Sequence, residues 1–111
     1  MKEEYKSAIA ELISVYAHID FLSMEACAKR MLREEGREAK LNMALQVEEE
    51  RKHYLLQRER LAELGVSMED KIPIDLYNRV RDELAEMDWF DFLTCLQVVI
   101  EGVGIAAVEE V

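Results

Sequence analysis

The spacing of apolar residues predicts that most of this chain is helical. From residue 3 to about residue 35, apolar side chains recur every three or four positions, which is the period of one face of an α-helix. A second helical pattern runs from residue 37 to about residue 64. Gly36 separates the two patterns and Gly65 follows the second, as glycines often do where helices end. Because the break at Gly36 is short, we expect the two helices to form an antiparallel hairpin.

The remaining sequence predicts a loop and a third helix. Residues 65–73 include a run of charged residues and end in the only proline, Pro73. From about residue 74 to residue 110, apolar residues are again spaced alternately four and three apart. The expected fold class is therefore all-α, with an antiparallel helical hairpin plus a third long helix in a single helical domain that spans residues 1–111.

The composition supports a small helical protein that associates with itself. Hydrophobic residues make up 50% and charged residues 34% of the 111 residues, with one proline and four glycines. This balance suits long helices. A chain of this length has only a modest core, so we expect a homodimer or a higher homo-oligomer, which would complete a partial bundle.

The net charge of −10 indicates which partners to expect. A surface this acidic repels the phosphates of nucleic acids and of anionic membranes, and it attracts cations. No segment approaches the roughly 20 consecutive apolar residues of a membrane span, and the first residues open a charged helix rather than a signal peptide. We therefore expect a cytoplasmic protein that binds neither nucleic acid nor membrane. Cys27 and Cys95 lie in apolar helical stretches and are expected to be reduced.

Each helical pattern has one acid at a position that its neighbours mark as buried. Asp20 lies in the apolar stripe of the first helix, Glu50 in that of the second and Glu101 in that of the third. Burying an ionised carboxylate is so costly that the group normally pairs with a cation, becomes neutral or binds a metal. His53, three residues after Glu50, completes a Glu-x-x-His step that places a carboxylate and an imidazole on one helix face. These four residues are the candidate metal ligands.

The geometry of a hairpin ranks the acids of the first helix. In an antiparallel pair that turns near Gly36, Asp20 lies level with the Glu-x-x-His step on the neighbouring helix. Glu25 lies off the Asp20 stripe and is the second choice. Tyr16 and Tyr54 each lie one turn from the candidate acid of their helix, where they are either core aromatics or hydrogen-bond donors to the ligands.

This arrangement resembles the ferritin-like di-iron carboxylate superfamily. Those four-helix bundles take one acid from the first helix, Glu-x-x-His from the second, and the same pair again from the third and fourth. Asp20, then Glu50 with His53, then Glu101 follow that order over nearly the whole chain. The spacing of the first two acids is similar to that in the bacterial multicomponent monooxygenases, the phenylacetyl-CoA epoxidase family and the encapsulated ferritins.

The resemblance implies both a cofactor and an activity. It implies a site for two iron ions, or for manganese, in which Glu50 bridges, His53 binds terminally and Asp20 caps the pair. Such a centre activates dioxygen or peroxide, or oxidises ferrous iron. The family therefore implies a di-iron oxidoreductase or ferroxidase whose catalytic residues are the metal ligands themselves, with hydroxylase, ferroxidase and peroxidase activities as alternatives.

The sequence departs from the family pattern in two ways. Asp20 stands where the family usually has glutamate, and no second Glu-x-x-His occurs in the chain, which ends ten residues after Glu101. The site is then completed in one of two ways. In the first, a second copy of the hairpin supplies the missing ligands, and Glu101 is not needed. In the second, a fourth helix comes from a partner chain or from a missing part of the protein, and Glu101 is then a ligand.

An alternative function belongs to another class. The chain would then be a non-catalytic acidic helical module that dimerises, with its buried acids paired to Arg30, Arg51 or Lys52. Under either interpretation no organic cofactor is expected. The sequence has no Gly-rich phosphate loop and no serine or cysteine nucleophile paired to a histidine by a known motif.

Overall fold

The computed structural model describes residues 2–66, 73–88, 91–92 and 94. Over these residues all the regular secondary structure is helical, which confirms the predicted all-α class. Among them, no helix combines the length and the apolar character that crossing a membrane requires. The helices are α1 (Glu3–Arg33), α2 (Arg37–Glu63) and α3 (Ile74–Glu86).

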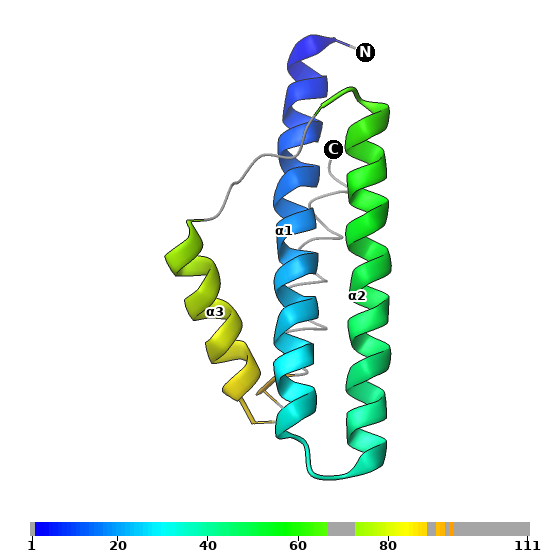
Figure 1. Ribbon diagram of the computed structural model, residues 1–111. Helices are drawn as coiled ribbons and strands as arrows, with labels where there is room; N and C mark the ends of the chain where they lie inside the picture. Colours follow the sequence, from blue (N-terminus) through cyan, green and yellow to red (C-terminus); the bar gives the residue numbers. More distant parts are fainter. Residues whose placement is uncertain (1, 67–72, 89–90, 93, 95–111) are drawn as a thin grey trace.

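α1 and α2 form the predicted antiparallel hairpin (Figure 1). Near the turn, Lys40 Nζ donates a hydrogen bond to the carbonyl of Met31 at 3.0 Å. Farther along, the Phe21 and Tyr54 rings meet edge to face with their centroids 5.1 Å apart. Both contacts join residues that the expected register places at the same height. The hairpin therefore has the alignment predicted from its turn.

α2 ends in a hydrogen-bonding pattern that requires a glycine. Gly65 has a φ of 73°, in the left-handed region that side chains with a Cβ seldom adopt. The Val66 N–H donates to the carbonyl of Leu61 at 3.0 Å, and the Gly65 N–H donates to the carbonyl of Ala62 at 2.9 Å. This pair of bonds is the Schellman motif, which satisfies carbonyls that the end of a helix leaves without donors. It explains why the helical pattern stops at Gly65.

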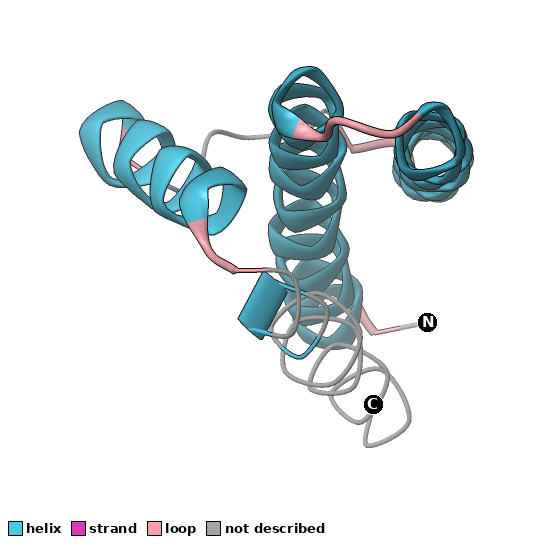
Figure 2. Cartoon of the chain, turned by 90° about the horizontal axis from the view of Figure 1, so that it is seen from below, coloured by secondary structure: helices cyan, strands magenta, loops and turns pink. Residues whose placement is uncertain are grey.

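α3 packs on the side of α1 that faces away from α2, so that α1 lies in the middle of the three helices (Figure 2). The Tyr77 hydroxyl donates to a carboxylate oxygen of Glu25. One turn farther along both helices, Lys29 Nζ lies 2.6 Å from Asp82 Oδ1. Because residue numbers rise together along this contact, α3 runs parallel to the C-terminal half of α1.

Side chains of α1 cap the C-terminal end of α3, which has no basic residue in its last turn. Arg30 donates to the carbonyls of Ala85, at 3.4 Å, and of Met87, and Arg33 donates to the carbonyl of Ala85 at 3.0 Å. The last carbonyls of a helix lack partners within it and carry partial negative charge. Arg30 is 5% exposed and pairs with Glu34 at 2.9 Å. The two guanidinium groups therefore supply the positive charge that α3 lacks.

The third helix is shorter than the sequence predicts. One helix is expected from residue 74 to about residue 110, but α3 ends at Glu86. Asp88 begins a new helical turn: its Oδ1 accepts the Asp91 N–H at 2.9 Å, and its carbonyl accepts the Phe92 N–H at 2.8 Å. This is the geometry of an N-cap, which competes with continuation of the preceding helix. The apolar spacing continues across the cap and so conceals the break. Residues 95–110 of the expected helix lie outside the described residues.

The main apolar cluster joins α1 to both neighbouring helices. Its α1 members are mostly small, and Ala26 and Cys27 are fully buried. Small side chains allow the helix backbones to approach closely, so α1 can serve as the central helix. Cys95, the other cysteine, lies outside the described residues. The cluster consists of Leu22, Ala26, Cys27, Met43, Leu84 and Phe92.

The Tyr77 contact predicts that alkaline pH weakens the packing of α3. Burial and the hydrogen bond to Glu25 hold the pKa of Tyr77 well above its ordinary value of 10.0. A raised pKa means that the contribution of this contact to stability is complete below pH 10.0 and is lost as the pH rises toward the pKa of the folded state. Between pH 9 and pH 12, the wild type should therefore lose more unfolding free energy than Tyr77→Phe, as measured by urea titration. Tyr5→Phe, at an exposed site, should lose as much as the wild type, and equal losses in all three proteins would contradict the prediction.

Candidate metal centre

Asp20, Glu50 and His53 come together at the middle of the hairpin. Each offers one ligand atom, and these atoms all lie within 4.8 Å of one another. Asp20 comes from α1, whereas Glu50 and His53 come from consecutive turns of α2. The helix spacing of three residues puts the last two on one face, and the hairpin register brings Asp20 level with them. The three ligands that the sequence predicts on α1 and α2 are therefore neighbours in space.

Burial differs sharply among the three side chains. Glu50 is 1% exposed and Asp20 is 4% exposed. The His53 side chain is 47% exposed, and its Nδ1 lies 3.7 Å from Glu50 Oε2. Two carboxylates placed close together away from water repel each other unless positive charge lies between or beside them. The group thus combines two buried carboxyl groups with an imidazole at the surface.

The distances within the group are suited to metal binding. Carboxylate oxygens and imidazole nitrogens bind ions such as Zn²⁺ or Mg²⁺ at about 2.0–2.2 Å, so two ligands of one ion lie at most about 4.4 Å apart. The His53 to Glu50 distance of 3.7 Å falls within that limit. All three ligand atoms lie within 4.8 Å of one another, a bound that exceeds this limit by only a few tenths of an ångström, so small side-chain rotations suffice to bring the three around one ion. A pair of ions about 3.5–4 Å apart also tolerates the wider spacing.

Glu25, the second choice on the first helix, lies at a different contact. It accepts a hydrogen bond from the Tyr77 hydroxyl, and its Oε2 lies 3.8 Å from Arg81 Nη1. Both partners belong to α3. Because α2 and α3 lie on different sides of α1, Glu25 faces the α3 contact and Asp20 faces the Glu-x-x-His step. The geometry therefore favours Asp20 over Glu25 as the ligand from α1.

The basic residues that the alternative interpretation pairs with the buried acids have other acidic partners. Arg51 Nη1 lies 3.1 Å from Glu48, and Lys52 Nζ lies 3.6 Å from Glu49. Both pairs are exposed and belong to the outer surface of α2. Arg30 pairs with Glu34 and caps α3. The ion pairs described here thus direct these basic groups away from the metal-ligand candidates.

Three more residues that the sequence suggests are placed as follows. Tyr54 is half-buried, meets the Phe21 ring edge to face and lies under Arg58, whose Cζ is 5.7 Å from the ring centroid. Tyr16 is half-buried on α1. Glu101 lies outside the described residues. These ring contacts of Tyr54 are compatible with both roles that the sequence leaves open for it.

Sequence reasoning misses one residue of the site. The Nε2 of Gln46 donates a hydrogen bond to Oε1 of Glu50 at 3.0 Å. Gln46 lies four residues before Glu50 on α2, a spacing at which helix side chains meet. The four-residue spacing from Glu50 was the only indication in the sequence that Gln46 belongs to the site. A glutamine on a charged helix is common, and its role becomes clear only when the orientation of the Glu50 side chain is known.

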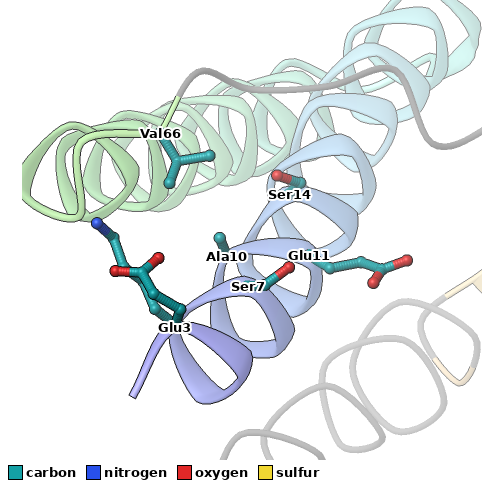
Figure 3. Close-up of a pocket in the computed structure, with 7 residues that line it drawn as sticks. Glu3, Ser7, Ala10, Glu11, Ser14 and Val66 are labelled. Carbon is teal, nitrogen blue, oxygen red and sulfur yellow. The ribbon is translucent and has the colours of Figure 1, made fainter. Parts of the chain in front are cut away.

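A hollow of about 220 Å³ lies elsewhere, at the open end of the hairpin (Figure 3). It is formed by the first three turns of α1 together with Val66, just beyond α2. Of the lining residues on α1, Ser14 is the nearest to Asp20, and it lies six positions before it, or about 9 Å along the helix. The hollow is therefore separate from the metal-ligand candidates. Its lining consists of Glu3, Lys6, Ser7, Ala10, Glu11, Ser14 and Val66.

Comparisons of the chain with protein-family models, with curated proteins and with solved structures gave no match.

Proposed function

We propose that the chain binds iron or manganese through Asp20, Glu50 and His53, and that it is a ferritin-like di-metal protein of the oxidoreductase or ferroxidase type. The observation that carries this proposal is the convergence of the three side chains. Their ligand atoms come from two helices and lie within 4.8 Å of one another, although two of the residues are almost completely buried. Burying two neighbouring acids is unfavourable in the absence of a cation, so their placement has a ready explanation in metal binding.

The donor set suits the proposed metals. Two carboxylates and one imidazole favour iron and manganese over copper, which prefers nitrogen and sulfur donors. Three protein donors also leave coordination positions for a substrate or for further ligands. A bound metal of this kind supplies redox chemistry with dioxygen or peroxide. Asp20 and Glu50 would hold a metal in a site shielded from water, next to the partly exposed imidazole of His53.

The proposal includes a second source of ligands. We propose a homodimer in which two hairpins face each other, so that each contributes Asp20, Glu50 and His53. Leu41 and Leu45 of α2 are 61% and 62% exposed, which is consistent with self-association in general. Because Leu41 lies half a helical turn around α2 from Glu50, these leucines belong to a different face from the facing sites. The alternative is a partner chain that supplies a fourth helix, with Glu101 as a further ligand.

The same leucines support the second candidate function, a non-catalytic helical interaction module. In that function the buried acids need basic partners rather than a metal. The pairing of Arg51 with Glu48 and of Lys52 with Glu49 weighs against it. Metal binding is therefore the stronger proposal.

Metal analysis of protein purified with ferrous iron tests the proposal, and the chain provides matched controls. The wild type should hold at least about one iron atom per two chains. His53→Ala should lose most of the metal, whereas His18→Ala, which alters the other histidine of the sequence, should retain it. Likewise Glu50→Gln should lose metal and Glu49→Gln should not, because Glu49 pairs with Lys52 at the surface.

Two results would reject metal binding: iron far below this level in the wild type, or a content that neither His53→Ala nor Glu50→Gln changes. Light scattering on the iron-loaded wild type separates the two ways of completing the site. A mass of two chains or more supports the facing hairpins. An iron-loaded monomer excludes them.

A further inference from the structure

Glu50 holds its two carboxylate oxygens in different surroundings. Oε1 accepts the hydrogen bond from Gln46 Nε2 at 3.0 Å. Oε2 faces the other way along the helix, 3.7 Å from Nδ1 of His53. The side chain is 1% exposed, so water cannot easily substitute for either contact. Gln46 thereby distinguishes two oxygens that are chemically equivalent in a free carboxylate.

We propose that Gln46 is a positioning residue of the metal centre, which holds Oε1 of Glu50 so that Oε2 is the oxygen presented to the metal. This inference rests on the proposed function. Groups that hydrogen-bond to a metal ligand fix its orientation, and their loss typically weakens metal binding about 10–100-fold. Gln46 occupies one turn of α2 and His53 the turn on the other side of Glu50. The amide therefore orients the carboxylate from the side opposite the imidazole.

The chemical nature of Gln46 suits this role better than a basic residue would. A glutamine amide donates a hydrogen bond without bringing positive charge. A lysine or arginine at the same place would neutralise Glu50 and compete with a cation for it. The basic residues on the neighbouring turn, Arg51 and Lys52, are paired on the outer surface of the helix instead. Gln46 thus holds Glu50 without bringing a positive charge to it.

The proposal also changes the expected binding mode of Glu50. The family resemblance implies that Glu50 bridges two ions through both oxygens. With Oε1 held by Gln46, we infer that Glu50 binds through Oε2 and leaves more coordination positions open for other ligands. Releasing Oε1 should allow both oxygens to bind and raise the coordination number of the metal.

Titration with Co²⁺, monitored by its visible absorption, measures affinity and coordination number in one experiment. Gln46→Met keeps the length and helix propensity of the side chain but removes the donor. We expect the Kd for Co²⁺ to rise about 10–100-fold. The absorption per bound ion should also fall, because six-coordinate Co²⁺ absorbs less than ions of lower coordination number. Gln46→Ala should give the same two changes, and circular dichroism should show a folded helical protein in both cases.

The matched control is Gln57→Met, two turns beyond Glu50 on the same buried face of α2. Gln57 accepts a hydrogen bond from Arg60 at 3.3 Å, and its replacement should leave both the Kd and the spectrum unchanged. A wild-type Kd and spectrum for Gln46→Met would overturn the positioning role while leaving the metal site intact. Failure of the proposed function gives a different result, in which wild type and Glu50→Gln both fail to bind Co²⁺.

Discussion

Glu50→Met should make the metal-free protein more stable while it abolishes metal binding. Glu50 is 1% exposed and its carboxylate lies beside that of Asp20. Replacing a buried ion pair or triad with apolar side chains of similar volume is often neutral or stabilising by about 1–4 kcal/mol, because the cost of desolvating the charges disappears. Removing one of two neighbouring acids also ends the repulsion between them. Methionine keeps the helix propensity and fills the same space. We therefore expect the unfolding free energy in the presence of a chelator to rise by about 1–3 kcal/mol, measured by urea titration.

Glu49→Met is the matched control for this experiment. Glu49 is the preceding residue of the same helix, and its side chain is 44% exposed. Its substitution should change the unfolding free energy by no more than about 0.5 kcal/mol. A loss of stability in Glu50→Met, rather than a gain, would mean that the carboxylate supports the fold. That result would favour the interaction-module function over the metal site.

Arg30→Met should cost about 2–4 kcal/mol of unfolding free energy. The Arg30 guanidinium is almost completely buried and donates to two carbonyls at the end of α3. It also pairs with Glu34 at 2.9 Å and lies over the Phe92 ring, 5.0 Å from its centroid. Methionine replaces the aliphatic stem but leaves the carbonyls without these donors and removes the charge paired with Glu34. Urea titration measures the loss.

Hydrogen exchange locates the effect of Arg30→Met within the fold. Backbone amides of α3 should exchange faster in the variant, whereas those at the centre of α2 should follow only the change in global stability. Arg33→Met is the control, since Arg33 donates to the same carbonyl of Ala85 from an exposed position. We expect it to cost about 0.5–1 kcal/mol. Equal losses in Arg30→Met and Arg33→Met would show that burial of the Arg30 charge has no special role.

The sequence predicted the hairpin more accurately than the third helix, for a local reason. The start and the end of α2 coincide with Gly36, its N-cap, and with Gly65, the glycine of a Schellman motif. A glycine at a helix end can be recognised from the sequence alone, because the preference depends on that single residue. The break after Glu86 depends on Asp88 acting as an N-cap. Aspartate is common on helix surfaces, so its capping role becomes visible only when its side chain is seen to accept the Asp91 N–H.

The candidate site was predictable to the extent that it depends on helix faces. Spacing alone puts Glu50 and His53 on one face of α2, and the position of the turn puts Asp20 opposite them. Gln46 was not predictable, because an amide four residues away can also turn toward solvent. Whether it does so depends on the packing around Glu50.

The sequence by itself therefore determined the helices of the hairpin, their register and the burial of Asp20 and Glu50. These properties follow from the period of an α-helix, which can be read from the spacing of apolar and polar residues along the chain. The tertiary structure alone decided that Glu25 and Arg30 belong to the contact with α3, that α3 runs parallel to α1, and that Gln46 orients Glu50. The physical reason is that a long polar side chain on a helix can reach several partners, and only the placement of the neighbouring helices selects one of them.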